Sequence, residues 1–405
     1  MKNINIIVLV YILLWLSCNP VTVEHTERSD YKFELMDSIK IGIPYKLQFL
    51  SKKLENEKFL CYSQVENKFY LIRANGEILS NFNNQGEGPE EYSHNILQAG
   101  IYKNKIYIQD NKNLIKFDIK NSKTWKNSYQ NPFYIGTGGG IKNKLLFMND
   151  SIWINPIPVT EVVLGSSRKT EVLDTISIIQ IRKFDIELGI SEIIDEIEYE
   201  RGSINKSDEI YPNFNVIFDI DDSGNIWVIY QNEPSLYNYK INKSNKLLLF
   251  QHSQLDINYF KEPKGVSEKE LDNPKNNRSS QLKENPEITL NRNILIQLSA
   301  INSQIYDIFY TENNTIFIMY RNGIPDKYFP EDDIWYYSDE SKNFGAIIKE
   351  MKVIDSGISL PEHNSTKLNP YNTLYIGENK WLVLQDYEIE IDHQTAYIYE
   401  LIKYN

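Results

Sequence analysis

Short strand-forming segments separated by tight Asn, Asp and Gly turns recur along almost the whole chain, and this repetition constrains the fold more than any other feature. One clear example is the pair of segments 214–220 and 226–230, which the turn Asp221-Asp222-Ser223-Gly224-Asn225 joins. Val, Ile, Tyr, Phe and Trp are frequent in these segments, as is typical of strands, and helical periodicity is scarce. The sequence therefore predicts an all-β protein.

Six units of three or four such segments can be counted, each about 50 residues long with irregular insertions. They cover residues 57–82, 96–119, 144–185, 214–251, 305–354 and 372–404. A single β-sandwich would normally use fewer strands, and two stacked sandwiches would also fit the length. The recurrent order favours a six-bladed β-propeller of mostly antiparallel four-stranded blades, with a few loop or short-helix insertions.

We expect a single propeller domain over residues 31–405, interrupted by insertions. Residues 190–199 are predicted to form a short helix. The charged, aperiodic segment 255–293 is predicted to be a surface loop, with a helical turn at 267–271. An unassigned strand-like segment at 33–41 is expected to pair with the last strand, near 395–404, and so to close the ring.

The N-terminus is typical of an exported protein. Met1-Lys2-Asn3 precedes an apolar run at 4–16, which is shorter than the roughly 20 residues that span a bilayer but suits a signal peptide. The run ends at Ser17-Cys18 and resembles a bacterial lipobox, in which the cysteine is lipid-modified. We therefore predict a signal peptide at 1–17, lipidation of Cys18 and a tether at 18–30. Ordinary cleavage or an uncleaved anchor are the alternatives.

Composition excludes two classes of function. The net charge of -12 argues against a nucleic-acid partner, because phosphate repels an acidic surface. The mean hydropathy of -0.45 excludes a polytopic membrane protein. Cys61 is the second of two cysteines, so a lipid on Cys18 leaves no internal disulfide, and Cys61 is expected to be a small buried apolar residue.

A constrained turn lies between the first two units. In it, Gly86 and Gly88 allow backbone angles closed to other residues, and Pro89 fixes its own φ. The Lys-Ser/Thr pair of a phosphate-binding loop is missing. We therefore interpret Gly86, Gly88, Pro89, Glu91 and Tyr92 as a structural turn motif between blades, in which Tyr92 packs and Glu90 or Glu91 caps neighbouring amides.

Residues 84–92, together with Asn75-Gly76-Glu77-Ile78, resemble the Gly-x-Gly-Pro-x-Glu-aromatic signature of the six-bladed β-propeller lipoproteins of Gram-negative bacteria, relatives of the NHL-repeat propellers. Residues 106–118 and 219–228 are similar to the blade and turn patterns of the same family. The resemblance implies an exported, usually lipid-anchored propeller in the cell envelope. We expect an outer membrane lipoprotein, either periplasmic or surface-exposed. The resemblance implies no catalytic residues.

Candidate chemistry is sparse. The run from Asp219 to Gly224 overlaps the start of an EF-hand loop, but Tyr230 stands where a bidentate Glu is needed, so a tight turn is favoured over a calcium site. Histidines show no metal-ligand spacing, and neither Gly-x-Ser-x-Gly nor His-Glu-x-x-His occurs. The acidic run 331–333, before Trp335, suits either glycan contact or a solvated turn.

These observations predict a non-enzymatic, monomeric binding module without a cofactor, which contacts a protein, peptide or glycan through loops on one face. The alternative is a divalent-metal-dependent hydrolase or lyase, lactonase-like or polysaccharide-lyase-like, with its site at the central channel. A structural spacer in an envelope complex is a third hypothesis.

Overall fold

The structure, a computed structural model, describes nineteen segments of the chain. They are residues 29–83, 85–86, 91–92, 96–110, 113–118, 123–128, 143–147, 152–158, 176–185, 190–200, 209–210, 216–242, 246–261, 266–267, 302–323, 342–363, 366–367, 372–385 and 392–404. These residues form strands and turns and contain no helix. None of them therefore belongs to a helix that could span a membrane.

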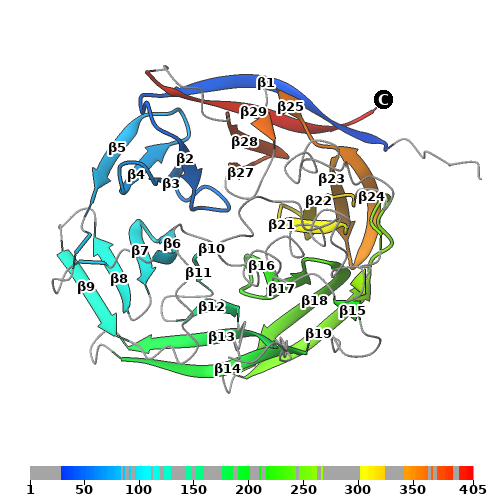
Figure 1. Ribbon diagram of the computed structural model, residues 1–405, viewed down its shortest axis with the longest axis horizontal. Helices are drawn as coiled ribbons and strands as arrows, with labels where there is room; N and C mark the ends of the chain where they lie inside the picture. Colours follow the sequence, from blue (N-terminus) through cyan, green and yellow to red (C-terminus); the bar gives the residue numbers. More distant parts are fainter. Residues whose placement is uncertain are drawn as a thin grey trace, which may run out of the picture.

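The strands form antiparallel sheets arranged in a ring around a central axis (Figure 1). The prediction of an all-β propeller is therefore confirmed. Five of the sheets have four strands each. A further sheet has four antiparallel strands, from β6 (Ile96–Tyr102) to β9 (Lys123–Ser128), and gains a fifth because β10 (Asn143–Lys144) pairs with β6 in parallel.

The first three sheets in chain order have the following bounds. The first consists of β2 (Leu47–Phe49), β3 (Lys58–Ser63), β4 (Lys68–Arg73) and β5 (Ile78–Phe82). The second consists of β6 (Ile96–Tyr102), β7 (Lys105–Asp110), β8 (Asn113–Asp118), β9 (Lys123–Ser128) and β10 (Asn143–Lys144). The third consists of β11 (Leu146–Phe147), β12 (Ile152–Pro158), β13 (Ile176–Asp185) and β14 (Ile190–Glu200).

The remaining sheets follow in the same order around the ring. One consists of β16 (Val216–Ile220), β17 (Ile226–Tyr230), β18 (Glu233–Ile241) and β19 (Leu247–Gln254). The next consists of β21 (Gln304–Tyr310), β22 (Thr315–Arg321), β23 (Asn343–Lys349) and β24 (Lys352–Ser359). The last consists of β27 (Thr373–Gly377), β28 (Lys380–Leu384), β29 (Gln394–Lys403) and β1 (Tyr31–Ile41). Two small ribbons pair β15 (Glu209–Ile210) with β20 (Val266–Ser267), and β25 (Glu362–His363) with β26 (Thr366–Lys367).

Tight hairpins explain why neighbouring strands pair in sequence order. Lys103 and Asn104 join β6 to β7 with φ of 48° and 58°, and Glu378 and Asn379 join β27 to β28 with φ of 50° and 56°. Two successive residues of positive φ are the geometry of a type I′ turn, whose twist matches that of the flanking strands. Asn is among the residues that tolerate this conformation best.

Closure of the ring follows the expectation from sequence. Strand β1 pairs antiparallel with β29 along almost its whole length, from Tyr31 opposite Lys403 to Ile41 opposite Gln394. The first described strand of the chain thereby becomes the outermost strand of the last sheet (Figure 1).

The predicted helix at 190–199 is wrong, because these residues lie in strand β14. Ten residue pairs join β14 to β13, starting with Asp185 opposite Ile190, and a bulge interrupts the register after Ile181. The preceding strand offers a continuous hydrogen-bonding edge, and Ile190, Ile193 and Ile197 are β-branched residues that suit a strand. Pairing within the hairpin therefore overrides the weak helical pattern.

The predicted surface insertion also begins later than expected. Leu255 and Ile257 are buried and belong to a core cluster with residues of β21 and β22. Ser267, the expected start of a helical turn, lies in strand β20 instead. Residues 268–293 lie outside the described residues.

The hydrophobic core is divided among the interfaces between neighbouring sheets. One cluster joins the first and second sheets, for example through Leu60 and Ile106, and another joins the last sheet to the first through Leu382 and Phe59. Buried faces on both sides of a sheet explain why several strands read as continuous apolar runs. Packing sheet against sheet in this way fixes the circumference of the ring.

The two faces of the ring differ in their connections. The first strands of the sheets run in one direction, because β6 and β10 are parallel and Lys53 forms a parallel bridge with Tyr375. Turns that follow the first strands meet one another on one face, for example where Asn104 N donates to the Glu55 carboxylate. We call this side the turn face, and the opposite side the loop face.

The longest connection on the turn face comprises residues 50–57. Every connection with more residues than this one begins and ends at strand ends on the loop face. The connections on the turn face are 50–57, 74–77, 103–104, 119–122, 148–151, 186–189, 221–225, 242–246, 311–314, 350–351 and 378–379. The connections on the loop face include 83–95, 129–142, 159–175, 201–215, 255–303, 322–342, 360–372 and 385–393.

Closure of the ring can be tested at Phe33, which packs edge-on against Phe317 and Trp381. Truncation to Ala should lower the free energy of unfolding by about 2 kcal/mol, because the ring is half-buried and loses apolar contact. Urea unfolding followed by Trp fluorescence measures the change. Leu35→Ala on the same strand is the control, since Leu35 is 48% exposed and its truncation should cost less than about 0.5 kcal/mol. Equal effects of the two substitutions would show that β1 adds little through its packed face.

Candidate functional site

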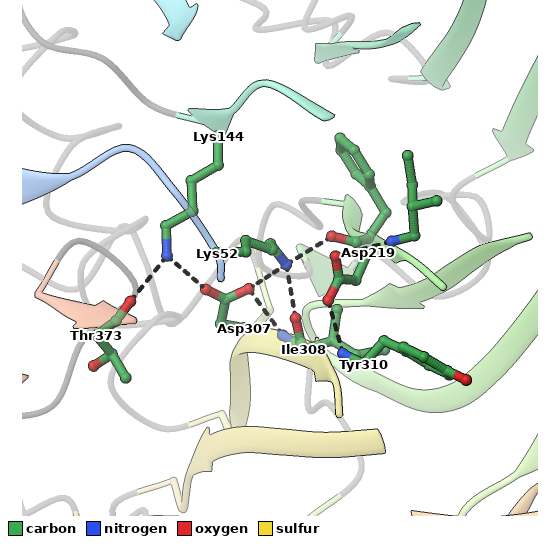
Figure 2. Close-up of polar contacts among 9 residues, drawn as sticks. Lys52, Lys144, Asp219, Asp307, Ile308, Tyr310 and Thr373 are labelled. Atoms are coloured by element: carbon green, nitrogen blue, oxygen red, sulfur yellow. Dashed lines mark hydrogen bonds and ion pairs between the residues drawn. The ribbon is translucent and has the colours of Figure 1, made fainter. Parts of the chain in front are cut away.

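A buried group of two lysines and two aspartates lies at the centre of the ring (Figure 2). Lys52 follows β2, Lys144 lies in β10, Asp219 lies in β16 and Asp307 lies in β21. Each contributing strand is the innermost of its sheet or, for β10, runs beside the innermost strand. We call these four residues the axial cluster.

Lys52 is the most connected member of the axial cluster. Its ammonium donates hydrogen bonds to Phe218 O at 2.7 Å, to Ile308 O at 2.7 Å and to Asp307 Oδ1 at 2.6 Å. An ammonium has three donors, so all of them are used. The backbone carbonyl of Lys52 also accepts a hydrogen bond from Tyr375 N at 3.0 Å.

Lys144 approaches the same carboxylate from the other side. Its Nζ lies 3.5 Å from Asp307 Oδ2 and donates to Thr373 O at 3.1 Å. The two oxygens of Asp307 therefore face one ammonium each, as Figure 2 shows. Asp307 Oδ1 also accepts from Ile308 N at 2.9 Å.

Asp219 is held by backbone amides. Its Oδ2 accepts from Tyr310 N at 2.7 Å, and its Oδ1 accepts from Ile220 N at 2.8 Å. Burial raises the pKa of the Asp219 carboxyl above its ordinary value, and the nearby Lys52 ammonium is the largest opposing influence. The two amides hold the carboxylate in place, and the charge of Lys52 favours its ionised form.

Burial also lowers the pKa of Lys144 from its ordinary value to about 8, although the Asp307 carboxylate opposes the shift. A lysine with a lowered pKa can act as a base or a nucleophile in a site that admits a substrate. Here Lys144 is only 8% exposed, and its ammonium already contacts a carboxylate and a carbonyl. The geometry of the axial cluster therefore indicates a structural role, in which buried polar contacts hold the inner strands together.

Sequence analysis missed Lys52, Lys144 and Asp307. It singled out Asp219 only as the start of a loop that overlaps an EF-hand pattern. A signal was available, because Phe218-Asp219-Ile220 and Tyr306-Asp307-Ile308 place one Asp between apolar residues in two equivalent inner strands. An acidic residue repeated inside buried strands predicts a charged partner at the axis.

The turn after Asp219 is organised by Asp221. Its Oδ1 accepts from the amides of Ser223 and Asn225, both at 2.9 Å. Its Oδ2 accepts from Asn225 Nδ2 at 2.7 Å and from Trp227 Nε1 at 3.1 Å. Both oxygens are thus used by donors of the turn itself. Among the described residues, no group of three or more His, Cys, Asp or Glu side chains is placed to hold a metal ion.

The stretch around Gly86 connects the first sheet to the second. Gly86 N donates to Tyr92 O at 3.0 Å, and Gln85 forms a parallel bridge with Tyr92. Tyr92 is fully buried and packs edge-on against Phe69 of β4 and Phe117 of β8. Its ring therefore belongs to the core between the two sheets.

The Glu91 side chain lies against Gly86, where a Cβ would collide with its carboxyl group. A residue larger than Gly at position 86 would therefore displace Glu91. Gly88, Pro89 and Glu90 lie outside the described residues, as do the signal peptide at 1–17, Cys18, the tether up to residue 28 and the acidic run 331–333.

Cys61 is fully buried in β3, as expected, and burial raises the pKa of its thiol. A thiol in this environment is a poor nucleophile.

Comparisons with known proteins identify no family. No family model matches the chain, and no curated protein matches it. Among solved structures, a Bacteroides fragilis protein described as exported has 11% identity and a TM-score of 0.48, covering 92% of this chain and 95% of its own. Streptogramin B lyase has 11% identity and a TM-score of 0.38, covering 92% and 98%. The N-terminal domain of Nup159 has 9% identity and a TM-score of 0.36, covering 91% and 77%. Similarities at this level assign neither an activity nor a ligand to the chain.

The axial cluster can be tested with Lys52→Met, which keeps an unbranched apolar side chain and removes the ammonium. The free energy of unfolding should fall by about 3 kcal/mol, because two carbonyls and one carboxylate oxygen lose their buried donor. Chemical denaturation measures it. Lys53→Met is the matched control, since Lys53 is 39% exposed and its ion pair with Asp222 should contribute less than about 1 kcal/mol. A loss no larger than that of the control would show that the axial cluster does not lock the ring.

The lowered pKa of Lys144 predicts a specific dependence of stability on pH. Between about 8 and the ordinary value of 10.5, the unfolded chain keeps the proton that the folded chain has released. Raising the pH through this window should therefore stabilise the folded state, by up to about 1.4 kcal/mol per pH unit. The measurement is urea unfolding from about pH 7 to 9, which stays about one unit below the ordinary tyrosine pKa of about 10. The rise should be absent from Lys144→Met, and parallel profiles for the two proteins would contradict the assignment.

Proposed function

We propose that this protein is an exported β-propeller, anchored to the cell envelope by a lipid on Cys18, which binds a protein, peptide or glycan through its loop face. The distribution of connections carries the proposal: all connections longer than residues 50–57 begin and end on that face. Loops on a rigid scaffold are where binding residues concentrate, because they vary without disturbing the core.

The proposal includes six blades. The five-stranded sheet of β6 to β10 contains four consecutive antiparallel strands, just as the other large sheets do. Its extra strand, β10, continues through Leu145 into β11, the first strand of the next sheet. Counting this sheet as a blade gives the architecture expected for the NHL-like lipoprotein propellers that the sequence resembles.

A binding role is favoured over catalysis by the state of the axial cluster. A catalytic centre in the channel needs side chains that can reach a substrate or a metal. Lys52 and Asp307 instead satisfy each other and the surrounding backbone, and Asp219 is held by two amides. No observation among the described residues favours the alternative of a metal-dependent hydrolase or lyase at the channel.

Site-specific photo-cross-linking tests where a protein or peptide ligand binds. A benzophenone amino acid in place of Val65, which is 68% exposed in the β3–β4 connection of the loop face, should cross-link to the ligand in intact cells. The same amino acid at Ser223, exposed in a turn of the opposite face, should give no adduct. A glycan ligand would appear as retention of the full chain on a glycan array. Adducts formed only from position 223 would place the binding surface on the turn face and contradict the proposal.

Metal analysis of the purified protein separates binding from the hydrolase or lyase alternative. The binding proposal predicts no stoichiometric divalent ion. A bound ion that is lost, together with a measurable activity, on substitution of Asp219 or Asp307 would overturn it.

A further inference from the structure

We infer that strand β19 is an interface through which two copies of this chain pair edge to edge across a two-fold axis. The inference goes beyond the proposed function, because it depends on neither the lipid anchor nor the ligand. It departs from the monomeric module predicted from the sequence. The exposure, the composition and the position of β19 carry it.

Strand β19 is the outermost strand of its sheet and lies on the rim of the ring (Figure 1). At its start, Leu247 N donates to Asp195 Oδ2 of β14 at 2.5 Å. Among the described strands, only β18 pairs with β19. The residues after Leu247 therefore present backbone donors and acceptors along an unpaired edge, onto which another strand can add.

Three consecutive large apolar residues occupy this edge. Leu248, Leu249 and Phe250 are 53%, 54% and 54% exposed. The register of Leu248 and Leu249 with β18 places their side chains on opposite faces of the sheet. Apolar surface is thus exposed on both sides of the edge, and a strand that adds there would remove part of it from water.

The other outermost strands are protected against edge pairing. Strands β1, β9, β14 and β24 each contain at least two Lys, Asp or Glu residues, which discourage the addition of another strand. Strand β5 has no charge, but its apolar side chains are half-buried. Strand β19 has a bulge at Phe250 in its pairing with β18, yet it contains no Lys, Arg, Asp or Glu. It combines an open edge, exposed apolar residues and no charge.

The absence of charge suits a second copy of the same strand. In antiparallel pairing across a two-fold axis, residues of one strand lie opposite residues of its own sequence. A strand with charges of one sign, such as β14, would repel itself in this arrangement, whereas β19 brings no like charges together. The net charge of -12 makes two copies of the chain repel each other, so an uncharged contact is the favourable place for them to meet.

Opposite charges lie just beyond the two ends of β19. Lys246 precedes the strand and Asp256 follows it by two positions, and both residues are exposed. Neither side chain forms an ion pair with another described residue. In the antiparallel pair, the Lys246 end of one copy meets the Asp256 end of the other. Two complementary contacts therefore form, one at each end of the interface.

Cross-linking tests whether two copies meet at β19. A short bis-maleimide should join two full chains at Gln251→Cys, an exposed position near the middle of the strand. The yield should be at least about fivefold higher than from Ile354→Cys, because unspecific collisions alone give a low yield. Ile354 is the matched control, since it is 55% exposed on the outermost strand β24. Cys61 is fully buried, and the parent protein is the blank for native cysteines.

The same reaction in crude extracts of the producing cells offers the strand to other partners. A product of twice the mass of the chain supports the second copy as the occupant of the edge. Equal yields from positions 251 and 354, or a product that joins position 251 only to a different protein, would overturn the inference.

Sedimentation of the purified full chain in detergent measures the association. We expect a monomer–dimer equilibrium with a dissociation constant on the order of 10 µM, since one strand per copy buries less area than a standard interface. Leu249→Lys should raise this constant at least about tenfold, because the two-fold axis places the new charge in the interface twice. Ile354→Lys should leave it unchanged. A parent chain that stays monomeric at about ten times the expected constant, or that assembles beyond the dimer, would contradict a closed pair.

Charge reversal separates pairing from a loss of folding. Lys246→Glu and Asp256→Lys should each weaken the dimer by about threefold, because like charges then meet at both ends. The double variant should restore the affinity of the parent, since opposite charges meet again. A double variant that dimerises no better than either single variant would refute the antiparallel arrangement.

Discussion

Burial of the Lys52 ammonium at the axis is the constraint on which the arrangement of the inner strands depends. Removing an ammonium from water costs several kcal/mol unless every donor finds an acceptor in good geometry. Here the acceptors are Phe218 O, Ile308 O and Asp307 Oδ1, which belong to two different sheets. The carbonyl of Lys52 accepts from Tyr375 N in a third sheet. Sliding of either of the first two sheets along the axis would take acceptors from the buried ammonium, and sliding of the third would break the hydrogen bond of Tyr375 N, so their relative heights are fixed together.

Apolar contact alone would fix these heights less well, because the interfaces between sheets are broad and built from similar Ile, Leu and Phe side chains. Hydrophobic burial is non-directional, whereas a buried hydrogen bond requires a particular distance and angle. The two kinds of interaction therefore fix different features of the ring. Packing holds each sheet against its neighbours around the ring, and the axial cluster sets the relative heights of the inner strands that it joins. Pairing of β1 with β29 then removes the gap that an open ring of sheets would leave.

The sequence predicts this fold well where the signals are local. Strands are recognised by their β-branched and aromatic residues, and hairpin turns by their Asn residues. Both signals, like the strand-like pattern at 33–41, depend only on residues close together in the chain. The helix expected at 190–199 fails because its partner strand, β13, overrides a weak periodicity. Of the axial cluster, only the aspartates leave a signal in the sequence, because Asp219 and Asp307 each lie between apolar residues in equivalent strands. Lys52 and Lys144 are far apart in sequence, and buried lysines are too rare to be expected without the three-dimensional arrangement.

The difference between the two faces follows from the same topology. On the turn face, connections contact one another: the Glu55 carboxylate accepts from Asn104 N, and the Glu312 carboxylate accepts from Glu378 N. Lys53, which follows β2, pairs with Asp222 in a turn of another sheet. A longer turn at any of these places would separate partners close to the axis, so length is constrained there. The loop-face connections join strand ends on the other face, and added length there costs little closure entropy. Variation in length is therefore confined by the fold to the face that we propose binds the ligand.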